Sequence, residues 1–247
     1  MGASDGEIGK VKDFYFDDHT WTLRYIIVET GGWLSGRKVL ISPESILKTD
    51  WDNQIFPVNL TMEQIKQGPD IDTDQPVSRQ QEIELNQHYP WTNYWGLGWE
   101  PGGLWGGGIG TTGMMIGTLA PLDGGPLQEE NNGQPSITHG DPQLRSYQKI
   151  KGYSITATDG SIGDVEDIIV DDSMWRVEML VVDTGHWLAG KRVLISPKWI
   201  KEIDWAMASV VVNVSTDKVK NSPEYDSSQP VTEDYHTNLH NHYGNQA

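Results

Sequence analysis

Cysteine is absent from the 247 residues of this sequence. Disulfides, thiolate metal sites and cysteine nucleophiles are therefore excluded. Basic residues are scarce as well, because 18 lysines and arginines stand against 35 aspartates and glutamates and give a formal charge of -17. This charge opposes the attraction to phosphate that supplies most nucleic-acid affinity, and it disfavours a polybasic contact with anionic lipid. We therefore expect no nucleic-acid binding, whereas a basic partner or divalent cations remain compatible with the composition.

Targeting and membrane signals are also missing. The first ten residues are polar and contain no basic segment followed by an apolar one, so the sequence predicts no cleaved secretion signal and, with the lack of cysteine, a cytoplasmic location. A charge-free stretch at 101–122 approaches the roughly 20 residues of a membrane span, but its many glycines would make a poor helix. We expect no membrane insertion, and a peripheral contact with a membrane complex stays open.

The common catalytic arrangements are not recognisable. No Ser-His-Asp constellation sits in a recognisable G-x-S-x-G context, and the glycine-rich stretch follows no expected strand and carries no G-K-[ST]. Asp13 and Glu29, with Asp167 and Asp183 further on, could be imagined as acid and base, but they are better explained as solvated strand faces. The sequence thus predicts a protein that is not an enzyme and has no cofactor.

An internal duplication is the strongest positive feature. Placing Asp159 on Asp5 is a shift of 154 residues (159 - 5), and it aligns the two halves without a gap. "DGEIGKVKDFYFDD" at Asp5 matches "DGSIGDVEDIIVDD" at Asp159, and "TGGWLSGRKVLISP" at Thr30 matches "TGHWLAGKRVLISP" at Thr184. A period this long indicates a duplicated domain of roughly 85 residues rather than a solenoid.

Each copy reads as a set of short strands. In the first copy, the aspartates at 17–18 predict a turn, a strand rich in β-branched and aromatic residues is expected to start at Trp21, and a third strand ends at Pro43. Two more strands are expected over 46–51 and 56–60. The second copy repeats the pattern, with its second strand expected to start at Trp175.

A short helix completes each copy. Thr61 is expected to cap a helix closed by Gly68 and Pro69, and Ser215 or Thr216 begins its counterpart. The predicted fold class is mainly β: two tandem small β-barrels of five or six strands, each with a short helix.

The region between the copies differs in character. We place the first domain at residues 1–90, a glycine-rich aromatic linker at 91–145, and the second domain with a histidine-rich tail at 146–247. Trp99 and Trp105 in this linker could form an adhesive patch, since large apolar side chains seldom stay solvated, or could fold back onto the barrels.

The ordered features of both copies resemble the PRC-barrel family, which is named for the cytoplasmic domain of the photosynthetic reaction-centre H subunit. The resemblance rests on "DGEIGKVKDFYFDD", Trp21, "IIVET", "WLSGRKVLISP" and Ile46, each repeated in the second copy. It covers roughly 1–77 and 153–231. It implies a small β-barrel that mediates protein contacts, either capping a membrane complex or assisting ribosomal assembly, and many members of the family stand alone without an assigned activity.

The loop between the second and third strands carries the candidate protein contacts. Its tryptophans either cover the open end of the barrel or act as exposed aromatic anchors, and the basic residues that follow could orient an acidic partner or guard a strand edge. The candidates are Trp33, Leu34, Arg37, Trp187, Leu188 and Lys191.

A histidine cluster near the end of the chain is the candidate metal site. His236, His240 and His242 have spacings that could bring imidazoles together around zinc or nickel, although a docked tail also explains them. The acidic turns at 17–18 and 171–172 could hold calcium or could simply be good turns.

Together these features predict a non-catalytic protein-interaction or scaffolding module that binds a protein partner or itself. Binding of divalent metal or a small ligand, by the acidic turns or the histidine cluster, is the alternative.

Overall fold

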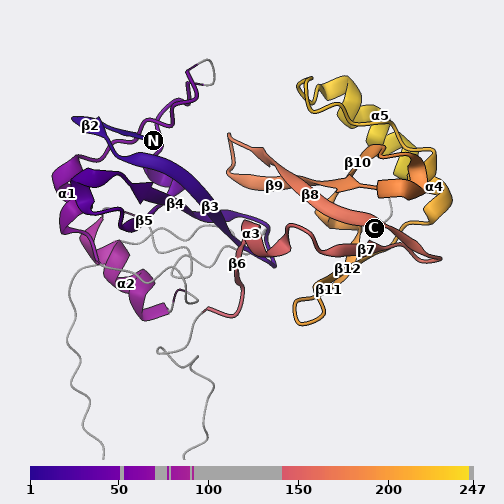
Figure 1. Ribbon diagram of the computed structural model, residues 1–247, viewed down its shortest axis with the longest axis horizontal. Helices are drawn as coiled ribbons and strands as arrows, with labels where there is room; N and C mark the ends of the chain where they lie inside the picture. Colours follow the sequence, from indigo (N-terminus) through magenta and orange to yellow (C-terminus); the bar gives the residue numbers. More distant parts are fainter. Residues whose placement is uncertain (51–52, 70–76, 78, 90, 92–140, 245–247) are drawn as a thin grey trace, which may run out of the picture.

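The computed structural model describes residues 1–50, 53–69, 77, 79–89, 91 and 141–244. It is mainly β and contains a four-stranded sheet, a six-stranded sheet and a separate two-stranded pair, which confirms the predicted fold class. Figure 1 shows the two larger sheets side by side, with α3 (Tyr147–Ile150) at the junction between them and most of the other helices away from it. Among the described residues, no helix is both long enough and apolar enough to span a bilayer.

The second copy forms a six-stranded sheet. Its order is β10-β9-β8-β7-β12-β11, in which only the β12–β7 pair is parallel. The strands are β7 (Ser154–Thr156), β8 (Ser161–Asp171), β9 (Arg176–Asp183), β10 (Arg192–Ile195), β11 (Ile200–Asp204) and β12 (Ser209–Val212).

Chain connectivity forces this sheet to curl. The strands β10 and β11 stand at opposite ends of the order, yet only the short 3-10 helix η4 (Pro197–Trp199) separates Ile195 from Ile200. In a flat sheet, five intervals of about 4.8 Å would hold them about 24 Å apart. A connection of about five residues reaches at most about 17 Å. The sheet must therefore bend round toward a barrel, as expected.

The first copy has a smaller sheet. Its sheet has the order β5-β4-β3-β6, and a separate pair β1-β2 precedes it. The strands are β1 (Gly2–Ala3), β2 (Gly6–Glu7), β3 (Gly9–Asp17), β4 (Leu23–Thr30), β5 (Lys38–Ile41) and β6 (Leu144–Ser146).

The two further strands expected in the first copy are reduced to isolated bridges. Ile46 pairs with Val58, and Gly2 pairs with Pro57 in parallel. The equivalent of Pro57 in the second copy is Val211 in β12, and proline cannot donate to a ladder. One residue therefore explains why the ladder is continuous in one barrel and broken in the other.

Both expected helices are present. The helix α1 (Met62–Gln67) starts at Thr61, which forms a capping box with Gln64, and α4 (Thr216–Lys220) starts at Ser215, whose hydroxyl accepts a hydrogen bond from the Lys218 amide.

Further helices were not expected from the sequence. They are α2 (Arg79–His88), α3 (Tyr147–Ile150) and α5 (Glu233–Tyr243), with the 3-10 helices η1 (Gly32–Leu34), η2 (Pro43–Ser45) and η3 (Gly185–Leu188). The histidine-rich tail is thus a helix, and it docks because Leu239 and Tyr243 are completely buried.

The second strand of each copy starts later than predicted, by two residues in the first copy and by one residue in the second. Trp21 and Trp175 lie in the left-handed region, with φ of 60° and 51°, so they belong to the turns, and the strands begin at Leu23 and Arg176. The turn at 17–18 is confirmed, because the Asp17 carboxylate accepts hydrogen bonds from the Thr20 amide at 2.8 Å and the His19 amide at 3.1 Å.

One glycine position in each copy is required by close backbone contact. A Cβ on Gly9 would lie 2.0 Å from the Glu29 carbonyl oxygen, and one on Gly163 would lie 2.0 Å from that of Asp183. Both glycines also have positive φ, 155° and 138°. The shared glycine therefore lets the first long strand of each copy lie close against the second.

Candidate functional site

The two barrels join through the tips of equivalent hairpins. Thr22 pairs antiparallel with Arg176, its own counterpart 154 residues later (176 - 22). The Leu23 amide donates to the Trp175 carbonyl at 2.7 Å. The reciprocal bond, from the Val177 amide to the Trp21 carbonyl, is 2.8 Å long. A residue that pairs with its own counterpart is the signature of a two-fold axis, so the chain folds as a fused pseudo-symmetric dimer.

Side chains at the first hairpin tip enter the second core. Phe16, Trp21 and Leu23 are nearly or fully buried and belong to the apolar cluster that also holds the strands of the second barrel. The Phe16 and Trp21 rings stack with centroids 5.2 Å apart. In return, Trp175 packs against the first core. The joint is therefore an apolar interface and not a loose tether.

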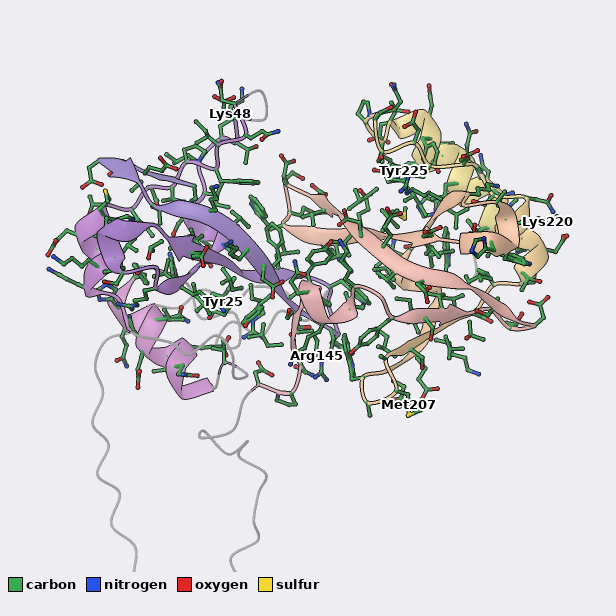
Figure 2. All side chains as sticks on the ribbon, viewed as in Figure 1. Tyr25, Lys48, Arg145, Met207, Lys220 and Tyr225 are labelled. Atoms are coloured by element: carbon green, nitrogen blue, oxygen red, sulfur yellow. The ribbon has the colours of Figure 1, made fainter. Side chains whose placement is uncertain are left out.

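The segment before the second copy contacts both barrels where they meet. Its strand β6 pairs with β3, placing Leu144 opposite Asp17 and Ser146 opposite Tyr15. The Arg145 guanidinium donates to Asp18 at 2.7 Å and lies over the Trp205 ring at 4.3 Å. Figure 2 shows Arg145 at the junction of the two barrels. The strand β6 lies across the predicted boundary between the linker (91–145) and the second domain (146–247), yet it completes the sheet of the first barrel.

The two loop tryptophans have different environments. The Trp33 indole donates to the Ile8 carbonyl at 2.7 Å and packs against the first core. Its counterpart Trp187 is 43% exposed. Among the described residues, no acceptor contacts the Trp187 indole N–H. Trp33 therefore packs on its own barrel, whereas Trp187 is exposed.

The two loops also differ in backbone conformation at one glycine position. The second loop begins at Gly185, whose φ of 54° is left-handed, whereas Gly31 at the equivalent position has φ of -64°. The 3-10 helix η3 accordingly starts one residue earlier than η1 does in its own repeat. The loop entries therefore differ in the same two loops whose tryptophans differ in exposure. Leu34 packs on the first core, and Leu188 is partly buried.

The basic residues of these loops bind backbone at the ends of the short helices. Arg37 donates to the Gly68 carbonyl at 2.8 Å, and Lys191 donates to the Lys220 carbonyl at 3.0 Å. Carbonyls at a helix C-terminus lack partners within the helix, so a cation there satisfies them. Neither proposed role, orienting a partner or guarding an edge, is needed to explain these two side chains.

A buried ionic cluster was missed in the sequence. The Arg24 guanidinium contacts Glu82, Asp141 at 3.0 Å and Asp17 at 3.6 Å, and each side chain is at most 7% exposed. It joins the second strand, the helix α2 and the segment that leads into β6. The sequence did offer one indication of this cluster, the single arginine within the largely apolar segment 23–30. A charged side chain that is buried in such a strand must be paired with an opposite charge.

The second copy has a carboxylate and a histidine at the same two positions. Glu178 and His236 stand at the positions of Arg24 and Glu82, and their side chains lie 3.5 Å apart. This pair is more exposed, at 41% for Glu178 and 18% for His236. The duplication therefore keeps a strand-to-helix polar contact while changing the chemistry on both sides of it.

The three histidines of the candidate metal site lie on α5 but have separate partners. His236 faces Glu178, His240 packs edge-on against Trp199, and His242 contacts the Lys218 carbonyl at 2.7 Å. His88 contacts the Gln64 carbonyl in the same way as His242 does. Within the described ranges, no group of three or more acidic or histidine side chains could hold a metal ion.

The acidic residues weighed as catalytic or calcium-binding groups also have local partners. Asp13 accepts from Ser146 at 2.5 Å, and burial raises the pKa of its carboxyl. A hydrogen bond from the Lys12 ammonium lowers the pKa of Glu29, and Asp167 accepts from the Tyr147 hydroxyl at 2.7 Å. Asp183 accepts from the Gly185 amide at 2.8 Å.

The second acidic turn repeats the geometry of the first. The Asp171 carboxylate accepts from the Ser173 hydroxyl at 2.6 Å and from the Ser173 amide at 2.8 Å, and these hydrogen bonds lower the pKa of Asp171. Its neighbour Asp172 is an exposed carboxylate on the same turn.

One serine does match G-x-S-x-G by its letters. Ser4 lies in "GASDG" at 2–6, in the turn between β1 and β2, and its hydroxyl donates to the Leu60 carbonyl at 3.2 Å rather than to a histidine. No strand-to-helix elbow surrounds it, so the sequence match has no catalytic context.

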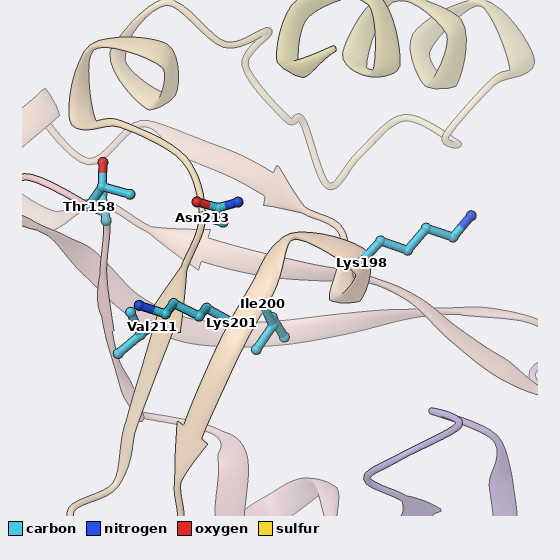
Figure 3. A pocket seen from close by; sticks show the side chains of 7 residues that line it. Thr158, Lys198, Ile200, Lys201, Val211 and Asn213 are labelled. Atoms are coloured by element: carbon cyan, nitrogen blue, oxygen red, sulfur yellow. The ribbon is translucent and has the colours of Figure 1, made fainter. Parts of the chain in front are cut away.

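A hollow on the second barrel is lined by two exposed lysines. It has a volume of about 530 Å³ and includes Lys198, Lys201 and Asn213 (Figure 3). The equivalents of the two lysines in the first copy are Glu44 and Leu47, so the hollow's charge is not repeated. The linker candidates Trp99 and Trp105 lie outside the described residues.

Comparison with known proteins supports the resemblance seen in the sequence. The profile of the family described as PRC-barrel domain matches residues 1–65 and 142–218, one segment in each copy. A protein of Deinococcus radiodurans described as uncharacterized is 32% identical over 77 residues, which are 31% of this chain. The matched part spans 27% of that relative's length.

Proposed function

Because the chain belongs to the PRC-barrel domain family through both of its halves, we propose that it is a non-catalytic protein-binding module whose contact surface is centred on Trp187. The observation that carries the proposal is the difference between the two loop tryptophans. Trp33 is held by its own barrel, whereas Trp187 presents 43% of its surface to solvent. Tryptophan is enriched among the residues that dominate binding energy at protein interfaces.

The surroundings of Trp187 suit this role. It stands on a short 3-10 helix between two strands of the second sheet, so the loop is held at both ends by a rigid ladder. Lys191 fixes the far side of the loop through the Lys220 and Ser222 carbonyls at 3.0 and 2.5 Å. A rigid aromatic side chain loses little conformational entropy on binding, which favours affinity.

The test is affinity capture with the full chain from its native cells. We expect a partner protein to be recovered with the wild type and lost with Trp187→Ala, because truncating a central aromatic anchor costs about 2 kcal/mol or more, roughly 30-fold in affinity. Met207→Ala is the matched control, since Met207 is also an exposed apolar side chain, at 75%. Recovery of every protein by Trp187→Ala at the wild-type level would refute the assignment of this surface.

A further inference from the structure

The first barrel has an added strand at the edge of β3 that has no equivalent on the second barrel among the described residues. β6 pairs with the outer edge of β3, and the Asp18 amide donates to the Gln143 carbonyl at 2.8 Å. On this stretch of β3, Tyr15 is 8% exposed and Phe16 is fully buried. In the second barrel the equivalent edge is the end of β8, residues 169–171.

No strand is paired with that end of β8 among the residues that the structure describes. β7 pairs with β8 only as far as Asp164, and β9 occupies the opposite edge. Ile169 and Val170 are partly exposed, unlike their counterparts Tyr15 and Phe16. The edge is therefore short, apolar and open, which is the kind of edge that accepts another chain.

The first barrel shows which backbone groups this edge presents. The Asp17 amide donates across to Thr22 in its own hairpin, and the next amide, that of Asp18, donates outward to the added strand. Amides alternate in direction along a strand, so the outward donors of the second barrel are those of Val170 and Asp172, the counterparts of Phe16 and Asp18. The Ile168 amide, which also turns outward, is already bonded to Asp167 at 2.8 Å.

Exposed apolar side chains surround the open edge. Residues 46–50 and 53–58 of the first copy lie beside it, since Thr49 contacts Asp172 at 3.4 Å and the Phe56 ring lies 6.3 Å from that of Trp175. The large apolar residues exposed on these two turns are Leu47, Ile55 and Met174, at 53%, 44% and 65%.

Their counterparts around the filled edge are polar. Lys201, Ser209 and Thr20 occupy the same positions beside β6. Among the described residues, three of the five exposed large apolar side chains therefore lie beside the open edge, and the other two are Trp187 and Met207. This contrast points to an occupant that covers them.

We propose that the outer edge of β8 at Val170–Asp172 accepts an extended segment of another protein as an added antiparallel strand. The segment would carry an apolar residue followed by a basic one, as Leu144 and Arg145 do on β3. The basic residue fits because Arg145 binds Asp18, whose counterpart Asp172 is an exposed carboxylate, and because the chain carries a charge of -17. Main-chain hydrogen bonds supply the affinity in such strand additions.

This site deepens the proposed function, on which it rests, by naming a class of partner, and it is a surface distinct from Trp187. The test uses the full chain and a capped peptide with the sequence of residues 141–148, titrated by fluorescence anisotropy and followed by amide hydrogen exchange. We expect saturable binding with slower exchange at Val170 and Asp172. A peptide carrying Arg145→Glu should bind at least tenfold more weakly.

Two protein variants examine the edge itself. Val170→Pro removes one outward donor and spares the bonds to β9, so it should weaken peptide binding at least tenfold. Asp172→Lys leaves the backbone intact and should also weaken binding, with a smaller dependence on salt. Circular dichroism checks that both variants are folded. If Val170→Pro does not fold, Asp172→Lys provides the same test.

Trp187→Ala separates this site from the proposed function. It should bind the peptide like the wild type, even where it loses the captured partner. Three results would overturn the strand-acceptor site: no binding up to millimolar peptide, protection at residues 15–18 instead of 170–172, or self-association of the chain that Val170→Pro abolishes. The last result would identify the occupant as a second copy.

Discussion

At the scale of single residues, the duplicated sequence supplies an internal comparison for the buried charge. Arg24 is enclosed with three carboxylates, those of Asp17, Glu82 and Asp141, whereas its counterpart Glu178 is 41% exposed beside His236. Removing one partner from a buried ionic cluster leaves uncompensated charge, while an exposed pair contributes little. The same strand position should therefore have very different effects on stability in the two copies.

We expect Arg24→Ala to lower the free energy of unfolding by about 3 to 5 kcal/mol, because three buried carboxylates would lose their cation. Glu178→Ala is the matched control and should change it by less than about 1 kcal/mol. Urea unfolding followed by circular dichroism gives both values. Equal losses at the two positions would mean that burial of the Arg24 cluster is not what stabilises the first barrel.

The tryptophans offer a second comparison of this kind. Trp33 packs on the core and donates to Ile8, so Trp33→Ala should cost about 2 to 4 kcal/mol of stability through lost packing and an unpaired carbonyl. Trp187→Ala should leave the melting temperature nearly unchanged, because an exposed side chain contributes little to folding. Thermal melts of both variants distinguish the two cases. A large loss of stability in Trp187→Ala would show that this tryptophan is structural.

At the scale of elements, the helices α2 and α5 are fixed to their barrels by equivalent contacts. His88 and His242 bind the carbonyls of Gln64 and Lys218 at 2.8 and 2.7 Å. The adjacent Tyr89 and Tyr243 are 3% and 0% exposed. The His-Tyr pair that recurs in the sequence therefore fixes each helix to its barrel, through a hydrogen bond from the histidine and burial of the tyrosine.

These tyrosines make docking sensitive to alkali. Burial raises the pKa of Tyr89 and of Tyr243 to about 12, above the ordinary value of 10.0. A phenol whose pKa is higher in the folded state stabilises the fold below the unfolded pKa, and that contribution is lost as the pH rises from about 10 to about 12. The loss amounts to about 1.4 kcal/mol per pH unit for each phenol.

We therefore expect the free energy of unfolding to fall steeply above pH 10 and to fall less steeply in a variant carrying Tyr89→Phe and Tyr243→Phe. Urea midpoints measured at pH 8, 9, 10 and 11 give the two slopes. Parallel slopes for the wild type and the double variant would show that neither phenol is protected by the docked helix.

At the scale of the whole molecule, the barrels are coupled through a shared interface. Phe16 lies on a strand of the first copy, yet it is fully buried in the apolar cluster of the second. Leu40, in contrast, is buried only in the first cluster. Cavities in a packed core destabilise what surrounds them, so these two positions should affect different parts of the molecule.

We expect Phe16→Ala to accelerate amide exchange in β10 of the second barrel, although residue 16 belongs to the first copy. Leu40→Ala should accelerate exchange mainly in β4 and β5. Hydrogen exchange read by mass spectrometry measures both patterns. If Phe16→Ala leaves the second barrel unchanged, the two halves open independently and the joint is not an energetic unit.

The sequence by itself determined the duplication, the β-rich class, the turns at the aspartates, the capped helices α1 and α4, and the family. These features depend on local patterns, such as a threonine before a helix or a run of β-branched residues, which one stretch of chain contains. Several boundaries were misplaced because Trp21 and Trp175 adopt left-handed turns that their residue type does not suggest.

Only the tertiary structure decided the relation between the halves. Two equal copies give equal sequence signals, yet β6 exists once, so it fills the edge of β3 and leaves the end of β8 without a strand among the described residues. The two copies also differ in the burial of Trp33 and Trp187 and of Arg24 and Glu178. Burial depends on what lies opposite a residue in space, and contacts between segments more than a hundred residues apart are not contained in any local pattern.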